Sequence, residues 1–173
     1  MRTITLLRHA KSSWNQPGAA DFARPLSPRG RRACSAVKAV LRRRKAAPDV
    51  VLVSSAVRTA ETLRRVAPQL PGEPAMILEK RLYLASAAKL LARLKALDDG
   101  FQSVLLIGHN PGLQRLALLL AGRGKEADLA RLAEKFPTAG LAELRFPGKR
   151  WSELASASAE LVFLWSPKDE ESD

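Results

Sequence analysis

Histidine occurs only twice in this chain, and both histidines follow a short apolar run. His9 comes after residues 3–7 and Arg8, and His109 comes after residues 104–107 and a glycine. An apolar run that stops at a polar residue is typical of a buried strand that ends at a loop. Ligands of open α/β sheets bind beyond the carboxyl ends of such strands. We therefore expect both imidazoles at one mouth, as a nucleophile or acid–base pair with Arg8 as an anion clamp.

A second arginine fits the same chemistry. Arg58 follows the apolar run 50–53 and is expected in the first turn of a helix, where free N–H groups and the helix dipole favour anions. Arginine presents a planar fork that pairs with two oxygens at once. A neutral imidazole, with an ordinary pKa of about 6.5, is a competent nucleophile near neutral pH. Two arginines and two histidines around one site therefore predict metal-free phosphoryl transfer through a histidine intermediate.

An alternating fold is needed to bring these residues together. We predict strands over residues 3–8, 50–53, 75–79, 104–107, 139–146 and 160–165, and helices over residues 28–45, 56–67, 86–97 and 110–121. Ser27 is a candidate N-cap for the first helix, with Pro28 in its first position. Asn110 and Pro111 are expected to do the same for the last helix. This order favours an α/β fold, a three-layer α/β/α sandwich with a mostly parallel central sheet.

The length of the chain indicates one domain, because 173 residues suffice for one full core. We assign residues 1–168 to this domain and residues 169–173 to an acidic, flexible tail. Met1 leads directly into a predicted strand, so we expect no signal peptide, and no apolar stretch approaches the roughly 20 residues that span a bilayer. The single Cys34 allows no intramolecular disulfide and is expected to be a structural thiol, which fits a reducing cytoplasm.

The net charge of +12 raises the alternative of a basic nucleic-acid-binding module. The densest basic segment is the predicted helix 28–45, where no aromatic residue is interleaved to form a stacking platform. We therefore expect a solvated, arginine-rich helix whose field attracts phosphorylated substrates, and nucleic acid is a disfavoured partner. Residues 122–126 lack the spacing of a phosphate-binding P-loop. Two histidines and one cysteine provide no metal-ligand cluster, and we expect no cofactor.

Several stretches of the chain combine into one larger pattern. They are Leu7-Arg8-His9-Ala10-Lys11-Ser12-Ser13-Trp14, Arg24-Pro25-Leu26-Ser27-Pro28-Arg29-Gly30, residues 54–62, residues 108–113 and Phe136-Pro137-Thr138-Ala139. In this order they resemble the histidine phosphatase superfamily, in its small SixA-type phosphohistidine phosphatase branch, over residues 2–166. The resemblance implies a phosphoglycerate mutase-like fold. It also implies that His9 becomes phosphorylated, while Arg8, Arg58 and His109 hold the phosphoryl oxygens.

The chain departs from the pattern of that family at a few positions. Ala10 replaces the glycine that usually follows the nucleophile, as it does in many members of this branch. Ala23 stands where an aspartate often precedes the Arg-Pro-Leu stretch, although Asp21 remains nearby. Leu84 follows Tyr83 where relatives often carry a carboxylate. The last two departures leave the proton donor open.

Three carboxylates are candidates for a general acid, which a phosphate ester needs to protonate its leaving group. Glu61 lies shortly after Arg58 and is expected to brace an arginine, whereas Glu79, next to Lys80, is expected at the surface. Asp21 is expected in a loop that closes over the site, as an acid or a substrate contact. The lack of an obvious acid favours a P–N bond, because the leaving nitrogen can be protonated from solvent and neutral imidazole leaves well.

Further side chains are candidates for contacts around the phosphoryl group. Those expected to contact phosphate or line the rim are Lys11, Ser12 and Asn15, which follow the nucleophile. Ser55 is expected to cap a helix or to donate to phosphate. The tryptophans, expected to pack rather than to stack on bases, are Trp14, Trp151 and Trp165.

Metal-independent hydrolysis of phosphohistidine through phosphorylated His9 is the function that these residues favour. The stretch between Tyr83 and His109 is used by one helix and one strand, so no insertion covers the site. An open groove suits a phosphohistidine carried by a protein. A small-molecule or sugar-phosphate phosphatase of the same superfamily is the nearest alternative. We expect a monomeric, cytoplasmic enzyme without a membrane partner.

Overall fold

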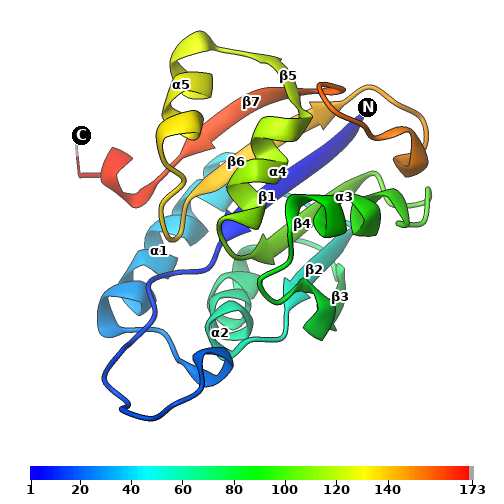
Figure 1. The fold of residues 1–173 in the computed structure, drawn as a ribbon. Helices are drawn as coiled ribbons and strands as arrows, with labels where there is room; N and C mark the ends of the chain where they lie inside the picture. Colours follow the sequence, from blue (N-terminus) through cyan, green and yellow to red (C-terminus); the bar gives the residue numbers. More distant parts are fainter. Residues whose placement is uncertain (172–173) are drawn as a thin grey trace.

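The computed structural model describes residues 1–171 and shows one mixed sheet of seven strands between two layers of helices (Figure 1). The strands are β1 (Arg2–Arg8), β2 (Val50–Ser54), β3 (Ala75–Glu79), β4 (Ser103–Gly108), β5 (Ala121–Gly124), β6 (Leu141–Phe146) and β7 (Ala159–Trp165). The helices are α1 (Pro28–Arg43), α2 (Val57–Val66), α3 (Ala87–Lys95), α4 (Gly112–Leu120) and α5 (Glu126–Glu134).

The order of the strands across the sheet is β3-β2-β4-β1-β6-β7-β5. β1 pairs in parallel with β4, β4 with β2, and β2 with β3. β6 runs antiparallel to both of its neighbours, β1 and β7, whereas β5 pairs in parallel with β7. The prediction of a mostly parallel sheet is therefore confirmed. Because parallel strands align their carboxyl ends, β1, β2 and β4 all end at one edge of the sheet.

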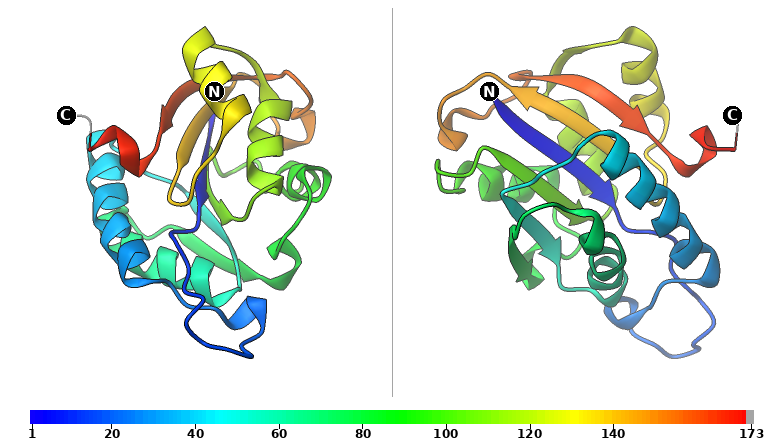
Figure 2. Two further views of the ribbon diagram at one scale, coloured as in Figure 1. Left: turned by 60° about the vertical axis from the view of Figure 1, so that its left-hand side comes forward. Right: turned by 180° about the vertical axis from the view of Figure 1, so that it is seen from behind.

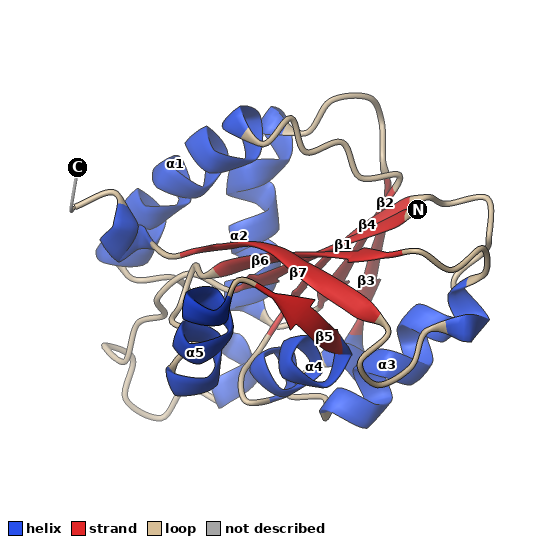
Figure 3. Ribbon diagram, turned by 90° about the horizontal axis from the view of Figure 1, so that it is seen from above, coloured by secondary structure: helices blue, strands red, loops and turns tan. Residues whose placement is uncertain are grey.

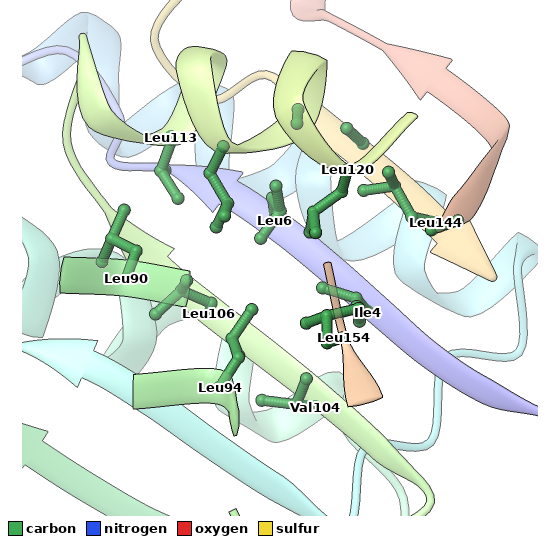
Figure 4. Close-up of a cluster of buried hydrophobic side chains, with 14 of the residues drawn as sticks. Ile4, Leu6, Leu90, Leu94, Val104, Leu106, Leu113, Leu120, Leu144 and Leu154 are labelled. Carbon is green, nitrogen blue, oxygen red and sulfur yellow. The ribbon is translucent and has the colours of Figure 1, made fainter. Parts of the chain in front are cut away.

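Alternating side chains along the strands build two hydrophobic layers. In β1, Ile4 and Leu6 are buried against α3 and α4, whereas Leu7 is buried on the opposite face among residues of α1 and α2. Figure 3 shows this division, with α1 and α2 over one face and α3, α4 and α5 over the other, as the three-layer prediction requires. Figure 4 shows leucines of α3 and α4 packed against the strands, in the hydrophobic layer that contains Ile4 and Leu6. A shift of β1 by one residue would turn each of these side chains to the wrong layer, so burial fixes its register.

Capping side chains explain where two of the helices begin. The hydroxyl oxygen of Ser27 accepts a hydrogen bond from the amide of Gly30 at 3.0 Å, and Pro28 lies in the first turn of α1, as predicted. Ser86 caps α3 in the same way. α1 ends at Arg43, slightly before the predicted end at residue 45. Lys45 has a φ angle of 51°, which is incompatible with a right-handed helix.

The start of α4 differs from the prediction. The peptide bond between Asn110 and Pro111 is cis, Pro111 is the N-cap, and the helix begins at Gly112. The side-chain oxygen of Asn110 accepts a hydrogen bond from the amide of Gln114 at 3.2 Å, and its nitrogen donates to the carbonyl of Phe136 at 2.8 Å. Asn110 therefore connects α4 to the loop before β6 instead of acting as the N-cap.

The strand β5 and the helix α5 are absent from the predicted elements. α4 ends at Leu120, and the next residues form an edge strand where the prediction continued the helix to residue 121. β5 contains two glycines and no β-branched residue, so only its pairing with β7 makes it a strand. α5 carries acidic residues in its first turn and a single buried side chain, Leu132, which is a weak helical signal in a mostly polar segment.

The C-terminal segment is attached to the domain beyond residue 168. Asp169 pairs with Arg131 at 2.9 Å, and a carboxylate oxygen of Glu170 accepts a hydrogen bond from the indole of Trp165 at 3.2 Å. Figure 2 shows this segment beside α1. Two carboxylates of the predicted tail therefore find partners on the domain, and the flexibility of residues 169–173 stays a prediction. Residues 172–173 lie outside the described residues.

Burial agrees with the expectations for Cys34 and for two of the tryptophans. Cys34 is a buried residue of α1, and burial raises the pKa of its thiol to about 11, so it is unreactive. Trp151 and Trp165 are buried, whereas Trp14 is 76% exposed and packs against the guanidinium group of Arg24. Within residues 1–171, no helix has both the length and the hydropathy that a membrane-spanning segment requires.

We expect Gly30→Ala to destabilise the domain, although alanine is the better helix former. A Cβ atom at this position would lie 2.0 Å from the carbonyl oxygen of Lys11, a backbone atom that cannot move alone. The expected loss in the free energy of unfolding is about 1–3 kcal/mol, as for other overpacked positions, measured by urea denaturation. Ser35→Ala, at an exposed position of α1, is the control and should change this free energy by less than about 0.5 kcal/mol. Unchanged stability of Gly30→Ala would contradict the close approach.

Candidate active site

The register of three parallel strands brings the predicted motifs to one edge of the sheet. Arg8 at the end of β1 pairs with Gly108 of β4, and Ile107 of β4 pairs with Val53 of β2. The side chains at or just beyond these pairs are those of His9, His109 and Ser54. The ring centroids of the two histidines lie 5.4 Å apart. Both imidazoles therefore share one mouth, as expected.

His9 is held as a neutral base in one tautomer. It is only 6% exposed, and its Nδ1 lies 2.7 Å from the carbonyl oxygen of Ala10. A carbonyl only accepts, so Nδ1 carries the proton and Nε2 keeps its lone pair. Burial is the main cause that lowers the pKa of His9, to about 4, and the charges of Arg58 and Arg8 add to it. Nε2 is therefore available as a nucleophile at neutral pH.

His109 is neutral for similar reasons but is held by a different partner. Its Nε2 lies 2.7 Å from the hydroxyl oxygen of Ser54, and the edge of the Tyr83 ring packs against it with a centroid distance of 5.4 Å. Burial lowers the pKa of His109 to about 3, with further contributions from His9 and Arg58. If the Ser54 hydroxyl donates to Nε2, the proton of the neutral ring lies on Nδ1. His109 then offers a hydrogen-bond donor without carrying a charge.

Both arginines of the prediction line the same pocket. An amino group of Arg8 donates to the carbonyl of Phe136 at 3.1 Å, and those of Arg58 donate to the carbonyl and carboxylate of Asp21 at 2.7 and 3.0 Å. The Nε atoms of both arginines and Nδ1 of His109 are buried without a partner among the described residues. Buried polar atoms rarely lack partners, so three such nitrogens at one site indicate an oxygen-rich ligand.

Asp21 is the one carboxylate among the described lining residues, and it is held ionised. Its oxygens accept hydrogen bonds from the hydroxyl of Tyr83, from Arg24 at 2.9 Å and from Arg58 at 3.0 Å. The bond from Tyr83, together with those from the arginines, holds the pKa of Asp21 far below its usual range. Asp21 lies over the site, as expected, but an ionised carboxylate braces the arginines and does not fit the expected role of an acid.

Arg24 and Trp14 form one side of the pocket. The guanidinium group of Arg24 lies 3.6 Å from the centre of the Trp14 ring and donates to the hydroxyl of Ser12 at 2.6 Å. Ser12 is buried and pairs with Leu26 in an isolated bridge that closes the loop after the nucleophile. The exposed Trp14 therefore packs on Arg24 at the rim of the site, and this cation–π contact stabilises the ring outside the core.

The pocket has a volume of about 410 Å³ and is lined by Arg8, His9, Lys11, Ser12, Trp14, Asp21, Arg24, Arg58, Leu84, His109, Asn110 and Thr138. Of the lesser candidates, Lys11 and Ser12 line it, whereas Asn15 and Ser55 do not. Ser55 does not cap α2 either, since Ala56 is its N-cap. In residues 1–171, no group of three or more histidine, cysteine or acidic side chains is arranged to hold a metal ion.

Several residues of the site were not predicted from the sequence. They are Ser54, Arg24, Tyr83 and Thr138, of which the first three contact a histidine, an arginine or Asp21. Ser54 directly follows the predicted strand 50–53, so the alternation of side chains between the two faces of that strand could have identified it. Leu84, beside Tyr83, lines the pocket, is 54% exposed and has a φ angle of 48°. That conformation is strained for leucine, and such strain is concentrated at functional sites.

The other two acid candidates lie outside the lining residues of the pocket. Glu61 accepts a hydrogen bond from the amide of Leu26 at 3.0 Å and lies 3.6 Å from Arg65. It braces an arginine, as expected, although not Arg58. The prediction that Glu79 is a surface carboxylate is wrong. Its side chain is 10% exposed because Arg93 of α3 covers it at 2.7 Å.

Comparisons with known proteins agree with this geometry. Residues 4–83 match the histidine phosphatase superfamily (branch 1). An uncharacterized protein of Mycobacterium tuberculosis is 37% identical over 164 residues, which cover 94% of this chain and 100% of that protein. The similarity therefore extends well beyond the segment that the family match covers.

Solved structures extend the comparison to the fold. A protein assigned as the phosphohistidine phosphatase SixA of Nakamurella multipartitia has a TM-score of 0.83 and 29% identity, covering 96% of each chain. The corresponding protein of Agrobacterium tumefaciens has a TM-score of 0.81 and 29% identity, covering 96% of this chain and 98% of its own. A mycobacterial glucosyl-3-phosphoglycerate phosphatase shares the fold, with a TM-score of 0.63 and 17% identity over 95% of this chain and 97% of its own. The predicted phosphoglycerate mutase-like fold is confirmed.

We expect both imidazoles to stay neutral well below pH 6.5, since burial lowers the pKa of His9 to about 4 and that of His109 to about 3. Nitrogen NMR of the two rings measures these values, and His109→Asn assigns the signals. An unfolded histidine titrates near pH 6.5 and takes up a proton that the folded chain does not bind. Stability present above that pH is therefore lost as the pH falls from about 6.5 to about 4 for His9 and about 3 for His109. Titration of either ring near its ordinary pKa would contradict the described burial.

Proposed function

Because this chain belongs to the histidine phosphatase superfamily, in its SixA-type branch, we propose that it hydrolyses phosphohistidine without a metal, through phosphorylated His9. One observation carries the choice of substrate bond. The described lining residues combine two neutral histidines with three arginines, and their one carboxylate is held ionised. The pocket therefore supplies a nucleophile and an anion clamp without supplying a carboxylic acid.

In the first step, the phosphoryl group passes to His9. Nε2 attacks phosphorus while the bond from phosphorus to the leaving nitrogen breaks, and the leaving imidazole departs neutral after taking a proton from solvent. Arg8, Arg58 and Nδ1–H of His109 donate to the equatorial oxygens, where negative charge gathers in the transition state. Ser54 supports this step by donating its hydroxyl to Nε2 of His109.

In the second step, water hydrolyses the phosphorylated enzyme. The oxygen of water attacks phosphorus, the bond from phosphorus to Nε2 breaks, and His9 recovers its lone pair. The protons of the water end on phosphate and in solvent. The bond from Nδ1 to the carbonyl of Ala10 keeps the ring in one orientation through both steps. The arginines hold the same oxygens throughout, so the second step needs no rearrangement of the clamp.

The state of Asp21 favours a P–N bond over a P–O bond. An alkoxide is a poor leaving group unless an acid protonates it, and Asp21 is bound to Tyr83, Arg24 and Arg58 as an ionised carboxylate. A nitrogen of phosphohistidine accepts its proton from solvent more readily. A sugar-phosphate phosphatase remains the alternative outcome, since a glucosyl-3-phosphoglycerate phosphatase has the same fold.

The partner and the setting belong to the same proposal. The pocket is open to solvent through exposed residues such as Trp14 and Leu84, which suits a phosphohistidine presented by a protein. Phosphate binding through side chains of this one chain suits a monomer. The lone, buried Cys34 favours a reducing compartment such as the cytoplasm. Lys11 and Ser12 contact the phosphoryl group or its immediate surroundings from the loop after the nucleophile.

We expect the enzyme to dephosphorylate a phosphohistidine-bearing carrier protein in the presence of a chelator, and to act weakly on sugar phosphates. His9→Ala should lower kcat/KM by at least about 1,000-fold, because it removes the nucleophile. Intact-mass spectrometry after rapid quenching should detect one phosphoryl group on the wild type and none on His9→Ala. Asn15→Ala, in the loop but outside the pocket, is the control. Full activity of His9→Ala would overturn the mechanism, and turnover of sugar phosphates alone would overturn the substrate.

We expect Ser54→Ala to lower kcat by about 10- to 100-fold with a smaller change in KM, because His109 loses the partner that fixes its proton on Nδ1. The neighbouring Ser55→Ala is the matched control and should retain wild-type kcat, because the hydroxyl that lies 2.7 Å from Nε2 of His109 belongs to Ser54. Steady-state kinetics with phosphohistidine measure both variants. Equal kcat values for the two variants would show that the bond between Ser54 and His109 has no part in the reaction.

A further inference from the structure

A second depression adjoins the catalytic pocket and is lined by cations. This basic groove has a volume of about 340 Å³ and is lined by Lys11, Arg29, Ala33, Lys135, Pro137, Thr138, Pro167 and Lys168. Its four charged residues are all cations, and all four are exposed. No acidic side chain is among its described lining residues. The groove is therefore a positively charged surface that is open to a partner.

The basic groove adjoins the catalytic pocket. Lys11 and Thr138 line both depressions. Lys11 lies two residues after His9, at the start of the loop that follows the nucleophile. A molecule whose phosphoryl group reaches His9 is therefore next to the groove at these two shared residues.

One wall of the basic groove is fixed to the loop after the nucleophile. The carbonyl oxygen of Lys11 accepts hydrogen bonds from the amide and the hydroxyl of Ser27, at 2.8 and 3.1 Å. Gly30 allows the first turn of α1 to approach that same carbonyl closely. Arg29 lies in this turn, so its backbone has a defined position relative to His9.

The other wall is fixed to β1. The amide of Ala139 donates to the carbonyls of Arg8 and His9, at 3.1 and 3.0 Å. The carbonyl of Phe136 accepts from the side chain of Arg8. Lys135 directly precedes this segment and is therefore held in register with the nucleophile. Both walls of the groove thus hold the backbone of their charged residues at set positions relative to His9.

The position of Arg29 is unfavourable for the helix itself. It lies in the first turn of α1, where the helix dipole favours anions, and that turn contains no acidic residue. A cation here has a small cost in stability that nothing in the described turn offsets. An anionic ligand in the basic groove would offset it.

We propose that the basic groove binds an acidic segment of the polypeptide that carries the phosphohistidine. This inference rests on the proposed function and names the kind of partner. Lys11, Arg29 and Lys135 come from separate parts of the chain, and the two lysines act as point charges that bind carboxylates in many arrangements. A compact second phosphate would instead favour a convergent arginine fork, such as the one at the catalytic pocket. Charge complementarity therefore points to scattered Asp and Glu side chains next to the phosphorylated residue.

The test compares two phosphohistidine peptides that differ only in their flanking residues, which are Asp and Glu in one and Asn and Gln in the other. Arg29→Gln/Lys135→Gln removes two charges of the groove, and Arg64→Gln/Lys95→Gln removes two exposed charges elsewhere. We expect the groove variant to raise KM for the acidic peptide by about 5- to 10-fold at low salt, with kcat nearly unchanged. KM for the neutral peptide should change by less than about 2-fold in both variants.

A third arm distinguishes the source of the negative charge. A small compound with a phosphoramidate and a second phosphate should respond less to the groove variant than the acidic peptide does. Binding of the unphosphorylated acidic peptide to His9→Ala, measured by fluorescence anisotropy, tests the groove without turnover and should weaken on adding Arg29→Gln/Lys135→Gln. If neither peptide is hydrolysed but this binding persists, the proposed function fails and the groove assignment stands. Equal KM values for both peptides in the wild type, equal effects of the two double variants, or an effect confined to the small compound would overturn the inference.

Discussion

The parallel pairing of β1 with β4 and of β4 with β2 is the constraint on which the rest of the site depends. It aligns three carboxyl ends, so His9, His109 and Ser54 meet although they are distant in sequence. The pairing is in turn held by burial, since alternate residues of β1 belong to two different hydrophobic layers. Strand register sets the positions of the two histidines, and loop residues such as Asp21 complete the pocket around them. The histidines are therefore positioned by the packed core, which is the least mobile part of a domain.

Burial and positive charge then set the chemistry of this edge. Both imidazoles are neutral because they are desolvated and lie near arginines, and the carboxylate of Asp21 is ionised because it is paired with those arginines and with Tyr83. The same cations therefore favour unprotonated imidazoles and an ionised carboxylate. A pocket of this type is complementary to a phosphoryl group, because its negative oxygens can form the hydrogen bonds that the buried arginines no longer form with water. Its one described carboxylate is engaged with these cations in the ionised form.

The sequence predicted those parts of the molecule that are governed by local pattern. Apolar runs predicted β1, β2 and β4, and the polar residues after them predicted where the site lies. Both signals are local, because a buried strand and its end can be recognised from consecutive residues. β5 was not predictable from its glycines, since pairing with β7 alone makes it a strand. The positions of Trp14 and Glu79 depend on Arg24 and Arg93, which come from other segments. The sequence predicted Ser55 as a candidate, whereas the hydroxyl that contacts His109 is that of Ser54. This difference of one residue depends on strand register, which composition does not determine. Tertiary partners therefore account for most of the differences.

The backbone at Leu84 has a consequence for how substrate range can diverge on this scaffold. Its φ angle of 48° suits asparagine, aspartate or glycine better than leucine, and its side chain faces the pocket beside Tyr83. A change to aspartate would relieve conformational strain and, in the same step, place a second carboxylate at the pocket. The catalytic strands would not have to move. The lining of the pocket can therefore diverge at this one position, independently of the core that places the two histidines.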